Sequence, residues 1–127
     1  MKLIIDSSIL IDNLRGGTVW DMILEDIEGK DAELIIPTIV IFELFSGKST
    51  LQQDIKIKIN SLLKIFHKIE LTEAIAIKAG ELARDVGKHI DPEDFIIAAS
   101  ALELNATVVT LNKKHFEQIT NLSLYPL

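Results

Sequence analysis

Three acidic residues lie among apolar neighbours and are the candidates for chemistry in this chain. Asp6, Glu43 and Asp94 each sit in or beside a stretch rich in Ile, Leu, Val, Phe and Ala. Burying a carboxylate without a partner is energetically costly. Each residue also lies where an element of a parallel α/β fold would begin or end. We therefore expect one shared acidic site that binds a cation.

The composition narrows the identity of that cation. The chain has no cysteine and three scattered histidines, which argues against zinc, and it lacks the closely spaced acids of a calcium-binding loop. Oxygen ligands favour Mg²⁺, for which Mn²⁺ can substitute. Such an ion activates water and stabilises charge on a phosphate, so we expect hydrolysis of a phosphodiester.

Asp6 and Glu43 also have structural explanations. Asp6 would end the first strand, where open α/β sheets bind ligands, but a turn aspartate can instead bond to nearby backbone amides. Glu43 lies too deep in its helix to be a cap, and a distant Lys or Arg could pair with it. These alternatives remain open from the sequence.

Asp91 and Asp94 belong to a segment that resembles an ideal helix opening, with Asp91 at the N-cap and Pro92 at the first position. Capping could therefore explain both acids. Helical spacing, however, puts Asp94 on one stripe with Ile97 and Ala101. We expect Asp94 to point towards the core edge and Asp91 to be the cap.

The elements that must position these residues alternate along the chain. Short β-branched runs predict strands, and periods of three and four predict helices. The predicted strands are Lys2–Ile5, Leu34–Ile36, Lys68–Leu71 and Thr107–Leu111, with Leu122–Tyr125 as an edge strand. The alternation predicts an α/β fold, a three-layer α/β/α sandwich with a mostly parallel central sheet.

The predicted helices begin at residues that can cap them. Ser7 and Ser8, Thr18, Thr72, Asp91 and Asn112 are the expected caps. The helices run from Ser7 through Leu14, Thr18 to near Gly29, Pro37 to Gly47, Leu51 to Phe66, Thr72 to Gly87, Asp91 onward, and Asn112 through Ile119. We expect Met22 on the buried face of the second helix and Leu51 on the buried stripe of the fourth.

The length and net charge of the chain limit the functions that it can have. The 127 residues suit a single domain, residues 1–127, and the net charge of −6 argues against a broad basic face. No signal peptide and no long uncharged apolar run is visible, so we expect a soluble cytoplasmic protein without a membrane partner. A local basic rim could still meet phosphates, and its candidates are Lys48, Lys56, Lys58, Arg84, Lys88, Lys113 and Lys114.

Taken together, the motifs resemble those of the PIN-domain ribonucleases, and most closely the small VapC toxins of VapBC toxin–antitoxin pairs. The resemblance spans the whole chain. It rests on the N-terminal strand into Asp6-Ser7-Ser8, on Glu43-Leu44 with Gly47, on Asp94-Phe95-Ile96-Ile97-Ala98-Ala99, and on Val109-Thr110-Leu111-Asn112 followed by His115-Phe116.

The resemblance implies a Mg²⁺-dependent endoribonuclease with Asp6, Glu43 and Asp94 as catalytic, metal-binding acids. It implies an RNA substrate, an antitoxin partner and a homodimer, with contacts through the helices around Ile39–Phe45 and Lys56–Phe66. Where the family often has a fourth acid, this chain has Asn112 and His115, so Asp91 and Asn112 are further candidate ligands. We expect Ser7, Ser8, Thr110 and His115 to position substrate.

Other classes of protein fit less well. A receiver domain pairs two acids after its first strand, and a phosphatase with an Asp-x-Asp motif needs an acid at position 8, where this chain has Ser8. The stronger alternative is a non-catalytic PIN-like binding or assembly domain, which the absent fourth acid would suggest. The three acids in their expected order favour the enzyme.

Overall fold

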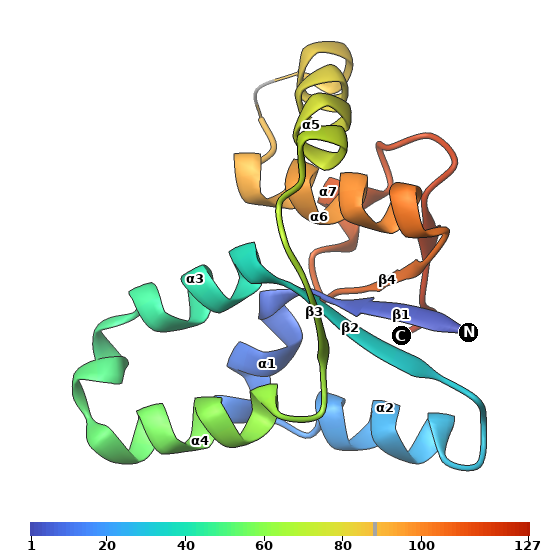
Figure 1. The fold of residues 1–127 in the computed structure, drawn as a ribbon. Helices are drawn as coiled ribbons and strands as arrows, with labels where there is room; N and C mark the ends of the chain where they lie inside the picture. The colour runs from blue at the N-terminus through green and yellow to red at the C-terminus, as the bar shows by residue number, and fades with distance from the viewer. Residues whose placement is uncertain (88) are drawn as a thin grey trace.

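A parallel sheet forms the centre of the computed structural model, which describes residues 1–87 and 89–127 (Figure 1). Lys88, one of the expected rim cations, lies outside the described residues. In the described ranges the strand order is β3 (His67–Ile69), β2 (Glu33–Pro37), β1 (Lys2–Ile5), β4 (Thr107–Val109) and β5 (Ser123–Leu124). Every adjacent pair is parallel, so the predicted mostly parallel sheet is confirmed.

The strand order reverses between β1 and β4. From β1 the chain builds outward through β2 to β3, and it then returns to add β4 and β5 on the other side. Ile5 of β1 is paired with Val109 of β4, so both strands end together. Parallel α/β sheets bind ligands at the carboxyl ends of their strands at such a reversal. Asp6 and Thr110 are the residues that follow these two strands.

Helices cover both faces of the sheet (Figure 1). The helical segments are α1 (Ser7–Leu14), α2 (Val19–Ile27), α3 (Thr38–Ser46), the 3₁₀ turn η1 (Lys48–Leu51), α4 (Gln53–Leu63), α5 (Glu73–Val86), α6 (Pro92–Leu104) and α7 (Lys113–Phe116). In Figure 1, α1, α2 and α4 lie on one face and α5, α6 and α7 on the other. This arrangement follows from right-handed crossovers on either side of β1, and it confirms the three-layer sandwich.

The core places β1 and α6 against each other. Leu3, Ile4 and Ile5 of β1 are completely buried, and so are Ile97 and Ala98 of α6. Small alanine side chains on α6 let its backbone approach the sheet closely, since packing distance depends on the side chains at the contact. The buried face of α6 includes Asp94 in the first turn of the helix, and α6 packs against β1.

Two predictions of buried residues are wrong. Met22 is 61% exposed, and Trp20 is buried instead, with its ring 5.6 Å from that of Phe66. The buried stripe of α2 therefore begins at Trp20 and continues through Ile23. Leu51 is 88% exposed because it belongs to η1, two residues before α4 begins.

Most of the residues predicted to cap helices do not make the expected side-chain hydrogen bond. Thr72 Oγ1 accepts a hydrogen bond of 3.2 Å from the backbone N–H of Ile75, as expected. Thr18, Asp91 and Asn112 occupy N-cap positions, but their side chains make no capping bond. Helix α1 has Asp6 rather than Ser7 or Ser8 at its N-cap, also without such a bond. The Ser8 hydroxyl donates to Asp6 instead.

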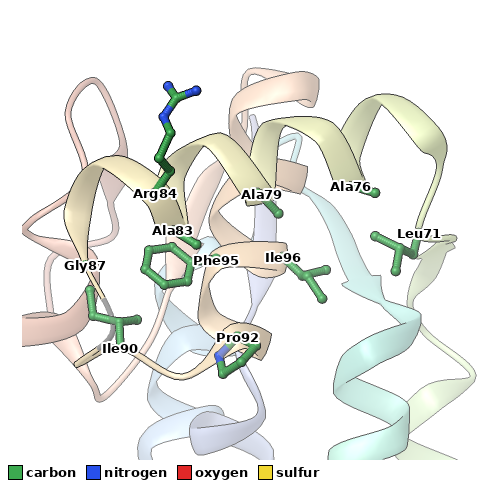
Figure 2. Close-up of a pocket in the computed structure, with 11 residues that line it drawn as sticks. Leu71, Ala76, Ala79, Ala83, Arg84, Gly87, Ile90, Pro92, Phe95 and Ile96 are labelled. Carbon is green, nitrogen blue, oxygen red and sulfur yellow. The ribbon is translucent and has the colours of Figure 1, made fainter.

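An apolar hollow of about 640 Å³ lies between α5 and α6, apart from the strand ends (Figure 2). Small residues of α5, such as Ala79 and Ala83, face Phe95 and Ile96 of α6 across it. Arg84 extends away from the hollow in Figure 2, and its guanidinium binds Asp85. Asp94 does not line this hollow. None of the described helices has the length and apolar character needed to span a bilayer.

Asn105 ends α6 in the left-handed conformation, with φ 54° and ψ 47°. Asn and Gly tolerate this conformation, whereas a β-branched residue is strained there. We expect Asn105→Gly to leave the free energy of unfolding within about 0.5 kcal/mol of wild type and Asn105→Val to lower it by about 1–2 kcal/mol. Urea denaturation measures both, and a Val variant as stable as the Gly variant would contradict this account of the helix end.

Candidate active site

Asp6 is held at the end of β1 by bonds from the neighbouring strand end. Its side chain is 1% exposed, and its backbone N–H donates to the carbonyl oxygen of Val109 at 3.0 Å. The hydroxyls of Thr110 and Ser8 both donate to its Oδ2, at 2.7 and 2.8 Å. Since both bonds reach the same oxygen, neither hydroxyl engages Oδ1. The structural alternative for Asp6, bonding of its carboxylate to turn amides, is not what the structure shows.

The two hydroxyls are themselves oriented by backbone amides. Ser8 Oγ accepts from the N–H of Leu111 at 3.0 Å, and Thr110 Oγ1 accepts from the N–H of Asn112 at 2.9 Å. Each hydroxyl therefore has its hydrogen available for Asp6. Ser8 and Thr110 position a carboxylate in this structure, and their expected contact with substrate stays a prediction.

Asp94 lies in the first turn of α6 and faces α7. Its Oδ2 is 2.7 Å from Nδ1 of His115, and the two side chains are 8% and 37% exposed. Burial raises the pKa of Asp94, the hydrogen bond from His115 lowers it, and the charge of Asp6 raises it; the net effect is a raised pKa. Asp94 thus points towards the core edge, as the helical stripe predicts.

Glu43 is the acid that the surrounding structure does not satisfy. Its Oε1 is buried and has no hydrogen-bond partner among the described residues. Burial and the charges of Asp6, Asp94 and Glu93 raise its pKa to about 7, and the Ser7 hydroxyl opposes the shift. No Lys or Arg in the described ranges pairs with it, so the salt-bridge explanation is wrong for this part of the chain.

The three acids lie directly after β1, in α3 and in α6, and a site shared by all three stays a prediction. Asp6 and Asp94 both raise the pKa of Glu43, and Asp6 raises that of Asp94, which requires their charges to lie near one another. Packing of α3 against α1 and α6 brings these segments together. Repulsion among three carboxylates favours either protonation of one of them or a bound cation.

Oxygen donors and the unpaired Oε1 of Glu43 suit a hard divalent cation. The ligand geometry is not preformed: in residues 1–87 and 89–127, no three His, Asp or Glu side chains are already placed to hold an ion. The residues fit a cation by chemistry and charge.

The remaining predicted residues surround the three acids. Ser7 is buried beside Glu43, and exposed Asp91 acts on Asp94 by raising its pKa. Asn112 is exposed and contributes its backbone N–H to Thr110. The charge of Glu93 raises the pKa of Glu43. The sequence did not single out Glu93 as a site residue, because an acid in the first turn of a helix is already explained by the helix opening. Its position next to Asp94 was the only available signal.

The expected basic rim receives limited support. Lys113 donates from Nζ to the carbonyl oxygen of Leu127 at 3.0 Å, and Arg84 is held by Asp85. The side chains of Lys48, Lys56, Lys58 and Lys114 are exposed. Thr110 also lines a hollow of about 940 Å³ between α2 and residues 125–127, but Asp6, Glu43 and Asp94 do not line it.

The chain is similar to known proteins in both sequence and fold. The family model for the PIN domain matches residues 3–122. Ribonuclease VapC19 of Mycobacterium tuberculosis is 31% identical, over 96% of this chain and 97% of the relative. Ribonuclease VapC1 of Methanocaldococcus jannaschii is 29% identical, over 97% of this chain and 85% of the relative.

Two solved structures have closely similar folds. VapBC-1 from nontypeable Haemophilus influenzae aligns with a TM-score of 0.83 at 26% identity, over 98% of this chain and 97% of the other. VapBC2 from Rickettsia felis, solved with a DNA fragment from its promoter, aligns with a TM-score of 0.82 at 25% identity, over 98% of both chains. The resemblance drawn from the sequence motifs is therefore confirmed, and this chain belongs to the PIN-domain family, alongside the VapC ribonucleases.

Proposed function

We propose that this chain is a metal-dependent endoribonuclease and the toxin of a toxin–antitoxin pair. Membership in the PIN-domain family, beside relatives named VapC ribonucleases, supports the reaction class. The observation that carries the assignment of the site is the buried, unpaired Oε1 of Glu43 between two further carboxylates. Most buried polar atoms in native proteins have a hydrogen-bond partner, so this unpaired oxygen supports a site that takes a ligand.

Asp6, Glu43 and Asp94 would hold the ion, which we propose is Mg²⁺ with Mn²⁺ as a substitute. Asp91 and Asn112 stay candidate ligands because they border the same acids. When bound, the ion supplies an activated water and stabilises charge on the scissile phosphate. Thr110 and Ser8 fix the Asp6 carboxylate from one side, which leaves its Oδ1 for ligation.

The carboxylates also make the ion a requirement for RNA binding. Three clustered negative charges repel a phosphodiester, so the uncharged or cation-loaded site is the one that accepts it. The exposed lysines of η1 and α4 and Lys114 of α7 would add positive potential at longer range. Such an activity on cellular RNA belongs in the cytoplasm.

The partners we propose are a cognate antitoxin and a second copy of the chain. The similar solved structures are VapBC complexes. Apolar side chains remain exposed on the two helices expected to make contacts: Phe42 of α3 is 61% exposed and Ile57 of α4 is 59% exposed. Burial of such residues is a favourable source of association energy.

We expect the purified chain without antitoxin to be a dimer at micromolar concentration. Replacing exposed Phe42 by Ser should weaken the dimer if α3 forms the interface, because a large apolar contact is lost. Light scattering gives the mass of both proteins. A wild-type monomer would contradict the dimer, and an unaltered dimer for Phe42→Ser would remove α3 from the interface.

Asp94→Asn should abolish cleavage of total RNA, with a loss of activity of about 100-fold or more, because it removes a charged ligand while keeping the shape of the side chain. Wild-type protein should give discrete fragments with Mg²⁺ or Mn²⁺ and none with chelator. Gel electrophoresis of the RNA measures both effects.

Asp31→Asn is the matched control for that experiment. Asp31 is exposed in the loop before β2, at the opposite end of the strands from Asp94. The Asp31→Asn variant should therefore cleave RNA like wild type. Cleavage that persists in Asp94→Asn would contradict the assigned site. No cleavage by wild-type protein at all would favour the non-catalytic binding domain.

Glu43 should make the metal-free protein less stable as pH rises. Its pKa is about 7 in the folded chain against 4.5 ordinarily, so the folded state binds more protons between these values and the free energy of unfolding falls as pH rises through them. At about pH 8, Glu43→Gln should be more stable than wild type by about 1–2 kcal/mol, and near pH 5.5 the gap should shrink.

Chemical denaturation in the presence of chelator measures this difference. Glu103→Gln, at an exposed position on α6, is the control and should follow wild type at both pH values. Equal stability of Glu43→Gln and wild type at the higher pH would show that the buried carboxylate carries no penalty.

A further inference from the structure

His115 makes one of the shortest polar contacts of the site. Its Nδ1 lies 2.7 Å from Oδ2 of Asp94, which is 21 residues away in the sequence and on a different helix. That distance is typical of a charge-assisted hydrogen bond. The Asp94 side chain is almost fully buried, whereas the His115 side chain is 37% exposed.

The chemistry of the two groups fixes the direction of this bond. An ionised carboxylate can only accept, so the proton must be on Nδ1 of His115. The bond occupies Oδ2 and leaves Oδ1 of Asp94 free of this contact. It also favours the charged form, because it is the largest influence that lowers the pKa of Asp94 against the effect of burial.

The position of His115 is itself well determined. Its neighbour Phe116 is 1% exposed and anchors α7 in the core, and the backbone N–H of His115 donates to the carbonyl oxygen of Asn112 at 3.1 Å. The helix that carries the imidazole is thus tied to the segment that follows β4. That same segment supplies Thr110, which orients Asp6.

The orientation of Asp6 and that of Asp94 follow one principle. Two hydroxyl donors hold one oxygen of Asp6, and one imidazole donor holds one oxygen of Asp94. Donors behind a metal-binding group fix its orientation and tune its affinity for the ion. Contact with substrate, the role expected for His115 from the sequence, does not account for its bond to a buried carboxylate.

We propose that His115 is a positioning residue that presents Asp94 to the divalent cation through its Nδ1–H group. This inference rests on the proposed function, since it assumes that Asp94 is a ligand. A fourth acid would otherwise lie after β4. In this chain His115 stands there instead, as a hydrogen-bond donor to the metal ligand Asp94. The affinity of the site for the ion then depends on a hydrogen-bond donor at the position of His115 Nδ1.

Three substitutions distinguish the effect of the Nδ1 donor from the effect of side-chain size. In His115→Asn the amide nitrogen lies at the same bond distance from the backbone as Nδ1, whereas in His115→Gln it lies one bond further out. His115→Ala removes the donor altogether. His67→Gln is the control, since His67 is an exposed histidine on β3, away from the acids.

Calorimetric titration of each protein with Mn²⁺ tests the proposal. His115→Ala and His115→Gln should bind Mn²⁺ about 10-fold more weakly than wild type, while His115→Asn should stay within about threefold. His67→Gln should match wild type. Thermal unfolding in chelator, expected to differ little among the four variants, checks that the fold is intact.

Each other outcome overturns a defined part of the account. If wild type binds Mn²⁺ and His115→Ala binds it equally well, His115 does not position a ligand, while the proposed function stands. If His115→Asn is as weak as His115→Ala, the Nδ1 donor is not what matters. If wild type and all variants fail to bind Mn²⁺ but remain folded, the proposed function itself fails.

Discussion

The carboxylate of Asp6 is almost completely buried where β1 ends, and the structure around it provides the donors that make this burial tolerable. Thr110 reaches it from the end of β4, 104 residues further along the chain, and Ser8 from the first turn of α1. The bond from Thr110 forms only if β1 and β4 lie side by side and end together. The sheet order and the acidic site therefore depend on each other.

The three acids of the site are stabilised to different degrees. Asp6 has two hydroxyl donors and Asp94 has an imidazole, whereas an oxygen of Glu43 has no partner in the described part of the chain. A site that satisfies two carboxylates and leaves the third unpaired is incompletely stabilised by its own residues. Binding of a cation would offset both the repulsion among the acids and the desolvation of Glu43.

The sequence predicts the parts of this arrangement that depend on local pattern. Buried strands, Asp6 at a strand end and the stripe that turns Asp94 inward follow from alternation and helical spacing, so the fold and the three acids could be expected. The sequence could not show which side of α2 faces the core. Met22 and Trp20 both fit an apolar face until the first residue of the helix is known. The exposure of Leu51 likewise depends on where α4 begins.

Contacts between distant residues were harder to predict. Ser8 was expected to cap α1, since a local amide is the usual partner of a serine at a helix start. Of its actual partners, Asp6 is two residues away, whereas the bond from Leu111 depends on the pairing of β1 with β4. The bond between His115 and Asp94 depends in the same way on how α7 packs beside α6. Neither contact leaves a periodic signal in the sequence.

The central claim is that Asp6, Glu43 and Asp94 form a single cation site. A crystal structure of the protein with Mn²⁺, with the ion located by its anomalous scattering, would test this most directly. We predict one strong peak at the end of β1, with carboxylate oxygens of Asp6 and Asp94 about 2.0–2.3 Å away and Glu43 turned towards it. A fully occupied peak elsewhere, or none at saturating Mn²⁺, would contradict the account.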